Sequence, residues 1–483
     1  MSGCMSRQSV SMRSAHGAVR RQSRAARLAP CWAAAHAPGR LCLSTSGREL
    51  QVENAGSASR RGMGRAALAA CLAFLLPTLP APLALADVGD GLRPGSFLLH
   101  PAVFLEFRYD SNVFRDSARD EDVTQVAAPL LRLLPELSLR TQGGAKAELR
   151  GKAQLELRQY LDDDPVVSEQ TSIGAHVSLD GELGKGSVLG LAARERFHYQ
   201  PEAGTHQVSL TNVPTYDRLL NTTEISARIR PGGGALEMAP GYQLDLERFP
   251  DYPVADLTIH TLQLRGRWRF MPKTALTLHG SYGWRMFDND YIPDANPVRA
   301  TAGLIGLLTN RFSLELDAGY GRLILEEGED PQGPIGGLSA TYRLTERLKI
   351  STGYAREFKS TTWSSYADSH LFFGKWRQQI AGQWQVLAGA SYELVLFSPL
   401  LNQAAGTALQ QDVIDGRQDG ILRAEASVEW RPNEWFSAAL GYNYERRATD
   451  AAARIVNIEG TADVLSYADY DRHLMFSKVG FVY

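Results

Sequence analysis

The sequence predicts an all-β fold, a transmembrane antiparallel up-and-down β-barrel of the outer-membrane type with about 18 strands. Three observations lead to this prediction: apolar and polar residues alternate with a period of two, tight turns alternate with long polar segments, and the last strand ends on an aromatic residue, Tyr483. Each alternating stretch is long enough for a tilted spanning strand, which needs roughly 9 to 11 residues. In hydrocarbon every backbone N–H and C=O must be paired internally, so such a sheet has to close on itself.

The composition excludes the other main fold classes. The chain has 483 residues, of which 44% are apolar and 22% charged, a balance unlike that of disordered chains. Its one continuously apolar stretch, Ala66 to Leu76, is shorter than the roughly 20 residues that a spanning helix needs. A bundle of membrane helices is therefore excluded.

The apolar stretch instead predicts a secretion signal over 63–86, because arginines precede the apolar centre and prolines follow it. Cleavage is expected between Ala86 and Asp87. We interpret residues 1–62 as an extension upstream of the natural start at Met63, the alternative being an organelle transit peptide.

The rest of the chain divides into a short periplasmic segment over 87–98 and the barrel over 99–483. All four cysteines precede Asp87, so the exported chain contains none, which excludes thiolate metal sites and cysteine nucleophiles. We expect neither a cofactor nor a bound metal. Removal of the basic leader leaves an acidic chain, which argues against nucleic acid as a partner.

The period of two is clearest over Ala145–Leu157 and recurs over Phe312–Tyr320 and Leu422–Trp430. A helix with this pattern would scatter its charges around its circumference, whereas a strand collects its apolar residues on one face. The alternative is a soluble β-sandwich, which would not place all its long loops on one side. Aromatic residues near strand ends predict the girdle of a membrane interface: Tyr109, Tyr199, Trp268, Phe270, Tyr282, Trp284, Tyr320, Tyr342, Trp376, Trp430, Tyr442 and Tyr444.

Two sizes of connection alternate along the chain, and their number predicts the strand count. Short turns are expected near 142–144, 183–186, 231–234, 271–274, 309–311, 345–347, 378–382 and 431–434. Long polar segments are expected near 111–125, 162–170, 200–216, 249–256, 287–297, 326–335, 359–365, 398–420 and 446–468. Such a series joins 18 strands and leaves both termini on the short-turn side, as in outer-membrane barrels.

The polar parity of the strands is expected to line the lumen, which is aqueous in a barrel of this size. Both signs of charge occur, and a mixed wall suits hydrated, hydrogen-bonding cargo. The Arg265, Arg267 and Arg269 ladder either grips an acidic sugar or phosphate or balances carboxylates on neighbouring strands. Each candidate also has the simpler interpretation of a solvated wall residue. The candidates are Glu106, Arg108, Lys146, Glu148, Arg150, Lys152, Glu156, Arg158, Arg265, Arg267, Arg269, Glu315, Asp317, Arg423, Glu425 and Glu429.

Motifs of enzymes are missing from the sequence. It contains neither a Gly-x-Ser-x-Gly elbow nor a His-Glu-x-x-His pair, so we do not expect an enzyme and expect no catalytic residues. The acidic runs at Asp162–Asp164 and Glu326–Asp330 fall in predicted loops. They are interpreted as solvated loop tips, the alternative being sites for divalent cations.

A local motif near the start of the barrel resembles a known family. His100-Pro101-Ala102-Val103 leads to Tyr109-Asp110-Ser111-Asn112-Val113-Phe114, and this resembles the opening of the Putative beta-barrel porin 2 family. The resemblance implies an outer-membrane barrel of the kind often encoded with exopolysaccharide synthesis genes. It further implies polysaccharide cargo and a periplasmic polysaccharide-export protein as a partner. Where the family tends to repeat Asp before Asn, this chain has Ser111.

The sequence thus predicts a bacterial outer-membrane channel that exports an exopolysaccharide. The alternatives are a general or solute-uptake porin, and a scaffold or adhesin that acts through its long loops without transport. Besides the cargo and the periplasmic protein, the expected partners are outer-membrane lipid and the barrel-insertion machinery, which reads aromatic strand endings such as Tyr483.

Overall fold

In the computed structural model, the described residues are 91–119, 125–142, 146–168, 170–203, 215–250, 256–288, 294–326, 330–359, 366–397, 417–449, 452–456, 463–467 and 469–483. The predicted extension over 1–62, the signal over 63–86 and its cleavage site at Ala86 and Asp87 lie outside the described residues. So does the start of the predicted periplasmic segment.

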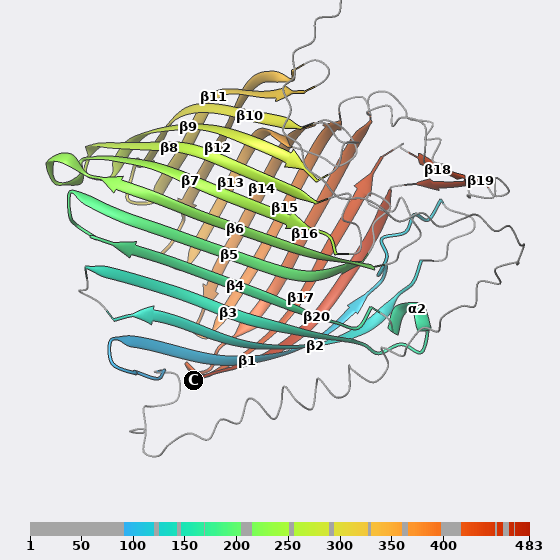
Figure 1. The fold of residues 1–483 in the computed structure, drawn as a ribbon. Coiled ribbons are helices and arrows are strands. Elements are labelled where there is room, and N and C mark those ends of the chain that lie inside the picture. Colours follow the sequence, from blue (N-terminus) through green and yellow to red (C-terminus); the bar gives the residue numbers. More distant parts are fainter. Residues whose placement is uncertain are drawn as a thin grey trace, which may run out of the picture. The chain divides into compact units, whose positions relative to one another are not determined.

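A single 18-stranded antiparallel sheet closes on itself, because β1 pairs with both β2 and β20 (Figure 1). This confirms the predicted fold class and strand number. The barrel strands are β1 (Phe97–Asp110), β2 (Ala128–Thr141), β3 (Ala147–Tyr160), β4 (Ser172–Leu183), β5 (Leu189–Ala203), β6 (Thr215–Ile229), β7 (Leu236–Arg248), β8 (Leu257–Met271), β9 (Thr274–Phe287), β10 (Ala295–Leu307), β11 (Phe312–Leu325), β12 (Gln332–Arg343), β13 (Leu348–Lys359), β14 (Ala367–Ile380), β15 (Trp384–Phe397), β16 (Gln418–Trp430), β17 (Phe436–Ala448) and β20 (Tyr470–Val482).

The alternating sequence gives the wall two different faces. On β3 the Leu155 side chain is 44% exposed on the outer surface, whereas the next residue, Glu156, points inward and is 2% exposed. Predicted girdle residues such as Trp268 and Tyr320 are also exposed on the outer face. Apolar residues outside and polar residues inside are the arrangement that a bilayer selects.

The two ends of the barrel differ in the length of their connections (Figure 1). We call them the turn end, which holds the tight turns and the carboxyl terminus, and the loop end. At the turn end, Gly184 adopts a φ of 68° in the β4–β5 turn, and a Cβ there would meet the Leu189 carbonyl oxygen at 2.7 Å. The turn between β6 and β7 is a short 3-10 helix, η2 (Pro231–Gly234).

The loop end carries two further small elements. A short helix, α2 (Pro165–Ser168), follows β3, and a separate hairpin of β18 (Ala452–Val456) and β19 (Asp463–Tyr467) lies in the last long connection. None of the helices among the described residues is long and apolar enough to span a membrane.

The motif that resembles the porin family forms part of the seam where the barrel closes. The Asp110 carboxylate, at the end of β1, accepts hydrogen bonds from Arg472 Nε on β20 at 2.9 Å and from the Asn112 N–H at 3.1 Å. The Asn112 amide donates to the Asp471 carbonyl at 3.2 Å, and Ser111 N–H donates to the His473 carbonyl at 3.0 Å. The motif therefore joins the first and last strands of the barrel into one wall.

The first long connection folds against the inner face of β2 and β3. Val113 and Phe114 pack on Leu130 and Tyr160 together with Val167 of α2. Burial of these side chains builds a small apolar core at the loop end, in a barrel whose wall is otherwise one strand thick. The sequence analysis predicted this connection as a long polar segment near 111–125 and did not foresee this core.

Candidate channel lumen

The predicted lumen residues of β1 and β3 point inward and lie together in one ion-pair network. Arg132 of β2 bridges them, with its Nη1 2.6 Å from Glu106 and its Nε 2.8 Å from Glu156. Arg108 pairs with Glu106, and Arg158 pairs with Glu156. Because Glu106 and Glu156 are almost fully buried, this network holds the wall together and offers little surface to cargo.

Other predicted residues of β3 lie nearer the turn end. Glu148 pairs with both Arg150 and Lys185, and Lys152 Nζ lies 3.0 Å from Glu136. The Lys146 side chain lies just before the strand, where its backbone carbonyl accepts the Gly184 N–H at 2.8 Å. These side chains are largely paired with opposite charges, as expected for a solvated wall.

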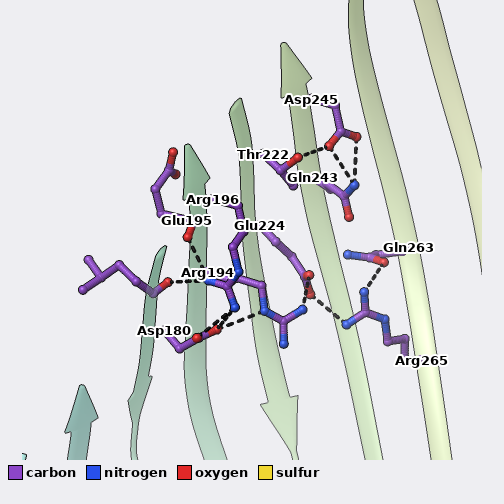
Figure 2. Close-up of polar contacts among 11 residues, drawn as sticks. Asp180, Arg194, Glu195, Arg196, Thr222, Glu224, Gln243, Asp245, Gln263 and Arg265 are labelled. Atoms are coloured by element: carbon purple, nitrogen blue, oxygen red, sulfur yellow. Dashed lines mark hydrogen bonds and ion pairs between the residues drawn. The ribbon is translucent and has the colours of Figure 1, made fainter. Parts of the chain in front are cut away.

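A second network crosses five strands, from β4 to β8 (Figure 2). Asp180 of β4 accepts from Arg196 Nη2 at 2.9 Å and from Arg194 Nε at 3.1 Å. Arg194 Nη1 reaches Glu224 of β6 at 3.1 Å, and Arg265 Nη1 of β8 reaches the other oxygen of Glu224 at 2.8 Å. The Arg265 side chain is therefore balanced by a carboxylate, one of the two roles predicted for the ladder.

The local sequence of β7 allows this reach across a strand. At the height of Arg265 and Gln263, β7 presents Ala239 and Gly241 to the lumen. Ala239 has a short side chain and Gly241 has none, so the path between β6 and β8 is open. The Arg265 guanidinium therefore passes over β7 to Glu224. A larger residue at Gly241 would meet the Ile225 carbonyl oxygen and the Ser226 Cβ, each at 3.0 Å.

The second network borders a recess of about 920 Å³ in the inner wall. Glu315 and Asp317 of β11 line it opposite Arg265 and Arg267, and the ring nitrogen Nε2 of His279 is buried there with no hydrogen-bond partner. The structure therefore brings together the predicted charges of β8 and β11. Charged groups with both signs and free hydrogen-bonding capacity can bind a hydroxylated or charged ligand.

A smaller recess of about 390 Å³ lies at the turn end of the same wall. Five cationic side chains and two carboxylates line it, and we call these residues the turn-end collar: Lys185, Arg228, Arg230, Arg267, Arg269, Glu182 and Glu237.

Cations of the collar are only partly neutralised. Arg230 Nη2 donates to Glu182 at 2.6 Å and its Nε to Glu237 at 3.1 Å, but its Nη1 is buried without a partner. Arg267 lies 3.9 Å from Glu237. Arg269 Nε donates to the Gly234 carbonyl at 3.2 Å, which is a neutral group. The collar thus has an excess of positive charge that an anion would offset.

On the far side of the barrel the remaining predicted residues have local contacts of their own. Arg423 of β16 lies 3.3 Å from Glu393 and 3.2 Å from Glu445, on the two adjacent strands. Glu429 accepts from Arg431 at 2.7 Å. Glu425 faces the position of Gly389 on β15, where a Cβ would meet its Oε1 at 2.7 Å. These residues do not join the networks of β1–β11.

Several charged residues of the networks were missed by the sequence prediction. Those on strands follow the same alternation as the predicted ones, so the parity rule applied to β2 and to β4–β7 would have found them, whereas Lys185 and Arg230 lie in turns, where parity does not apply. Parity does not predict the ion-pair partner of each charged residue, because that partner depends on the stagger between neighbouring strands. The missed residues are Arg132, Asp180, Glu182, Lys185, Arg194, Arg196, Glu224, Arg228, Arg230 and Glu237.

The acidic loop runs have local structural partners where the structure describes them. Asp164 accepts the Val166 N–H at 2.9 Å at the start of α2. Asp330 accepts the Leu325 N–H at 2.9 Å and pairs with Arg322, and these two contacts lower the pKa of Asp330. Among the described residues no three His, Cys, Asp or Glu side chains are grouped so that they could hold a metal ion.

Comparisons with known proteins agree with a barrel. The sequence profile of a family described as "Putative beta-barrel porin 2" matches residues 89–332. No curated protein matches the sequence.

Solved structures match the chain trace at low sequence identity. The FrpB iron transporter of Neisseria meningitidis, F5-1 variant in its apoprotein form, is 9% identical over 82% of each chain, with a TM-score of 0.44. OpdK of Pseudomonas aeruginosa with vanillate is 10% identical over 80% of this chain and 99% of that one, with a TM-score of 0.44. The siderophore receptor PirA of Pseudomonas aeruginosa is 9% identical over 80% of each chain, with a TM-score of 0.40. At this similarity, the ligands in those names say nothing about the ligand of this chain.

Proposed function

Because this chain belongs to the Putative beta-barrel porin 2 family and is an outer-membrane barrel of the channel class, we propose that it exports an acidic exopolysaccharide. The observation that supports this proposal is the turn-end collar, with five cations against its own two carboxylates and Glu148, which Lys185 shares with Arg150. Tight turns face the periplasm in outer-membrane barrels, so the collar lies on the inner wall of β4–β8 at the end where a secreted polymer enters. An incomplete set of ion pairs at an entrance attracts a polyanion from solution.

The connections at the turn end are basic and those at the loop end are acidic, which is the distribution that export of a polyanion requires. In the tight turns, basic residues outnumber acidic ones, which are Glu346 and Glu434. The long connections are instead rich in acidic residues, including Asp162, Asp163 and Asp164. The basic turn residues are Lys146, Lys185, Arg230, Lys273, Arg311, Arg347 and Arg431. A polyanion is drawn to the turn end and repelled from re-entry at the loop end. An uptake channel for anions would need the opposite distribution.

The wall between the two ends suits a sliding polymer. Barrels of 16 to 18 strands leave an aqueous channel, and here the Arg194 and Arg265 side chains beyond the collar are both paired with Glu224. Paired charges bind hydroxyl and carboxylate groups more weakly than free ones. Conduction requires that the cargo binds strongly enough to enter the channel and weakly enough to leave it. A positively charged collar followed by a wall of balanced charges meets both requirements.

Two partners belong to this proposal. A periplasmic polysaccharide-export protein docks at the turn end, where it delivers the polymer to the collar. The barrel-insertion machinery recognises the last strand, whose outward Met475, Val479 and Phe481 precede Tyr483.

Deletion of the gene should remove the polysaccharide from the cell surface and leave it in the periplasm, because the polymer has no other path through the outer membrane in this proposal. The measurement is an assay of uronic-acid polymer in the surface and periplasmic fractions. The wild-type gene should restore export. Unchanged surface polymer together with altered permeability to small solutes would contradict export and favour an uptake porin.

Replacement of Arg267 and Arg269 by glutamine should weaken capture of a polyanion at the turn end. In planar bilayers, oligogalacturonate added on the turn side should interrupt the current through the wild-type channel, and the double variant should need an about tenfold higher concentration, as expected for loss of charge-assisted hydrogen bonds. The measurement is the frequency of current blocks against oligomer concentration.

Arg431→Gln is the matched control, since Arg431 lies in a tight turn outside the collar and is paired with Glu429. It should leave the block unchanged. Neutral dextran oligomers should block wild type and variants alike. Equal block by oligogalacturonate from both sides, or no difference between wild type and the double variant, would contradict the proposed role of the collar.

A further inference from the structure

One carboxylate lies on the wrong face of the wall for a barrel surrounded only by lipid. Glu195 of β5 pairs with Leu179 of β4 and Thr223 of β6, and these positions belong to the outward parity, as the exposed Leu179 and Leu191 show. Figure 2 shows the Glu195 side chain directed away from the network of Arg194, which is on the opposite face. Glu195 is thus an ionisable group on the outer surface of the barrel.

Glu195 is not alone at this place. Thr223 Oγ1 donates to Glu195 Oε2 at 2.6 Å, and the Asn221 amide donates to the other oxygen, Oε1. Asn221 and Thr223 lie on the outward face of β6, next to Glu195. We call these three residues the outer polar cluster.

The height of the cluster on the wall makes it costly in lipid. Glu195 is six residues from the turn end of β5 and eight from its loop end, so it lies near the middle of the strand. On the other described strands the charged side chains of the outward face, such as Arg322 and Asp368, lie near the loop end. Polar and ionisable residues at the middle of a bilayer are expensive and mark functional positions.

A second feature of the same wall also distinguishes it from a lipid-facing one. Large aromatic residues stand at the turn ends of β8, β12, β14–β17 and β20, as Trp268, Trp376 and Trp430 do. The outward positions at the turn ends of β3–β6 hold aliphatic residues instead, such as Leu183, Leu189 and Ile229. The interfacial girdle that anchors a barrel in lipid is therefore interrupted beneath the outer polar cluster.

We propose that the face of β4–β6 is the contact surface for a second copy of this chain, with the outer polar cluster at its centre, while β3 beside it stays in contact with lipid. The cluster is complementary to itself, because it contains a carboxylate acceptor together with the amide of Asn221 and the hydroxyl of Thr223. In a two-fold interface the same patch meets on both partners, so Glu195 of each copy faces the Asn221 amide of the other. Such hydrogen bonds between membrane segments support association, and the contact removes the cluster from lipid.

Glu195→Leu tests this inference, since it makes the outer face more apolar and leaves the lumen unchanged. The protein extracted from outer membranes in mild detergent should have the mass of two chains by light scattering, and the variant should associate about tenfold more weakly. Thr352→Leu on β13 is the matched control, because Thr352 is an exposed polar residue on the outer face on the other side of the barrel. It should leave the mass unchanged.

Cysteine cross-linking in intact membranes gives a second measurement that does not depend on detergent. The described residues contain no cysteine, so Ala193→Cys, one outward position from Glu195, reports on this face alone, and Ala340→Cys on β12 is its control. Oxidation should link Ala193→Cys, and not Ala340→Cys, into a product with the mass of two chains. A monomer in both measurements, equal association of Glu195→Leu and wild type, or a cross-linked product containing a different protein would overturn the inference.

Discussion

Asp110→Ala should lower the free energy of unfolding by about 3 to 5 kcal/mol, the usual cost of removing one partner from a buried ion pair. Asp110 is 2% exposed and holds the Arg472 guanidinium across the seam between β1 and β20. Without the carboxylate, Arg472 keeps its charge in a largely buried position, and the Asn112 N–H loses its acceptor. The measurement is guanidinium unfolding of the refolded barrel in detergent, followed by tryptophan fluorescence.

Asp471→Ala is the matched control for this prediction. Asp471 is also an aspartate at the seam, but its side chain is 51% exposed, accepts from the exposed Tyr444 hydroxyl at 2.7 Å and lies 3.9 Å from Arg446. Exposed pairs contribute about 0.2 to 1 kcal/mol. The double variant Asp110→Ala with Arg472→Met should recover much of the loss, because it removes the unpaired charge. Equal losses for Asp110→Ala and Asp471→Ala would contradict the role of the seam.

Strands, turns and faces were predictable from sequence because their signals are local. The period of two on β3 needs only neighbouring residues, and the turn at 183–186 is indicated by Gly184 and Gly186. The structure confirms 18 barrel strands, and the tight turns that it describes in full lie at or next to their predicted positions, whereas most of the predicted turn at 142–144 lies outside the described residues. A barrel repeats one simple rule, so each strand gives the same information again.

What the sequence did not reveal depends on contacts between distant segments. The pairing of Asp110 with Arg472 joins residues 362 positions apart, and nothing near either residue indicates the other. The first connection reads as a polar loop, yet Val113 and Phe114 are buried against Tyr160. Their burial becomes visible only when β1, β2 and β3 are placed side by side.

For the candidate lumen, too, the sequence predicted the local features and missed those that depend on distant contacts. Parity assigned Arg265, Arg267 and Arg269 to the lumen, and all three point there. Their roles differ because their partners differ: Arg265 is matched by Glu224, while Arg269 donates to a neutral carbonyl. Glu195 breaks the parity rule on the outer face, and such local inconsistency is expected where a protein has a functional constraint.

Leu155→Arg should lower the free energy of unfolding in lipid by about 2 to 4 kcal/mol, as expected for an arginine on the lipid face near the bilayer midplane. Leu155 lies at the middle of β3 and is 44% exposed on the outer surface. A guanidinium at this height is far from water and from the polar headgroups, and the described outer face offers no carboxylate on β2 or β4 beside it. The measurement is chemical unfolding in phospholipid vesicles.

Gln154→Arg, one residue away, is the control that isolates the face of the wall. Gln154 points into the lumen, where its amide donates to Glu136 at 3.0 Å, so an arginine there gains a carboxylate and stays in water. The substitution should therefore change the free energy of unfolding by less than about 1 kcal/mol. Because both residues lie on one strand at nearly one height, a difference between them measures the lipid environment of the outer face. Equal costs would mean that the outward parity of β3 does not face hydrocarbon, and the assignment of lumen and lipid faces along the whole wall would fail with it.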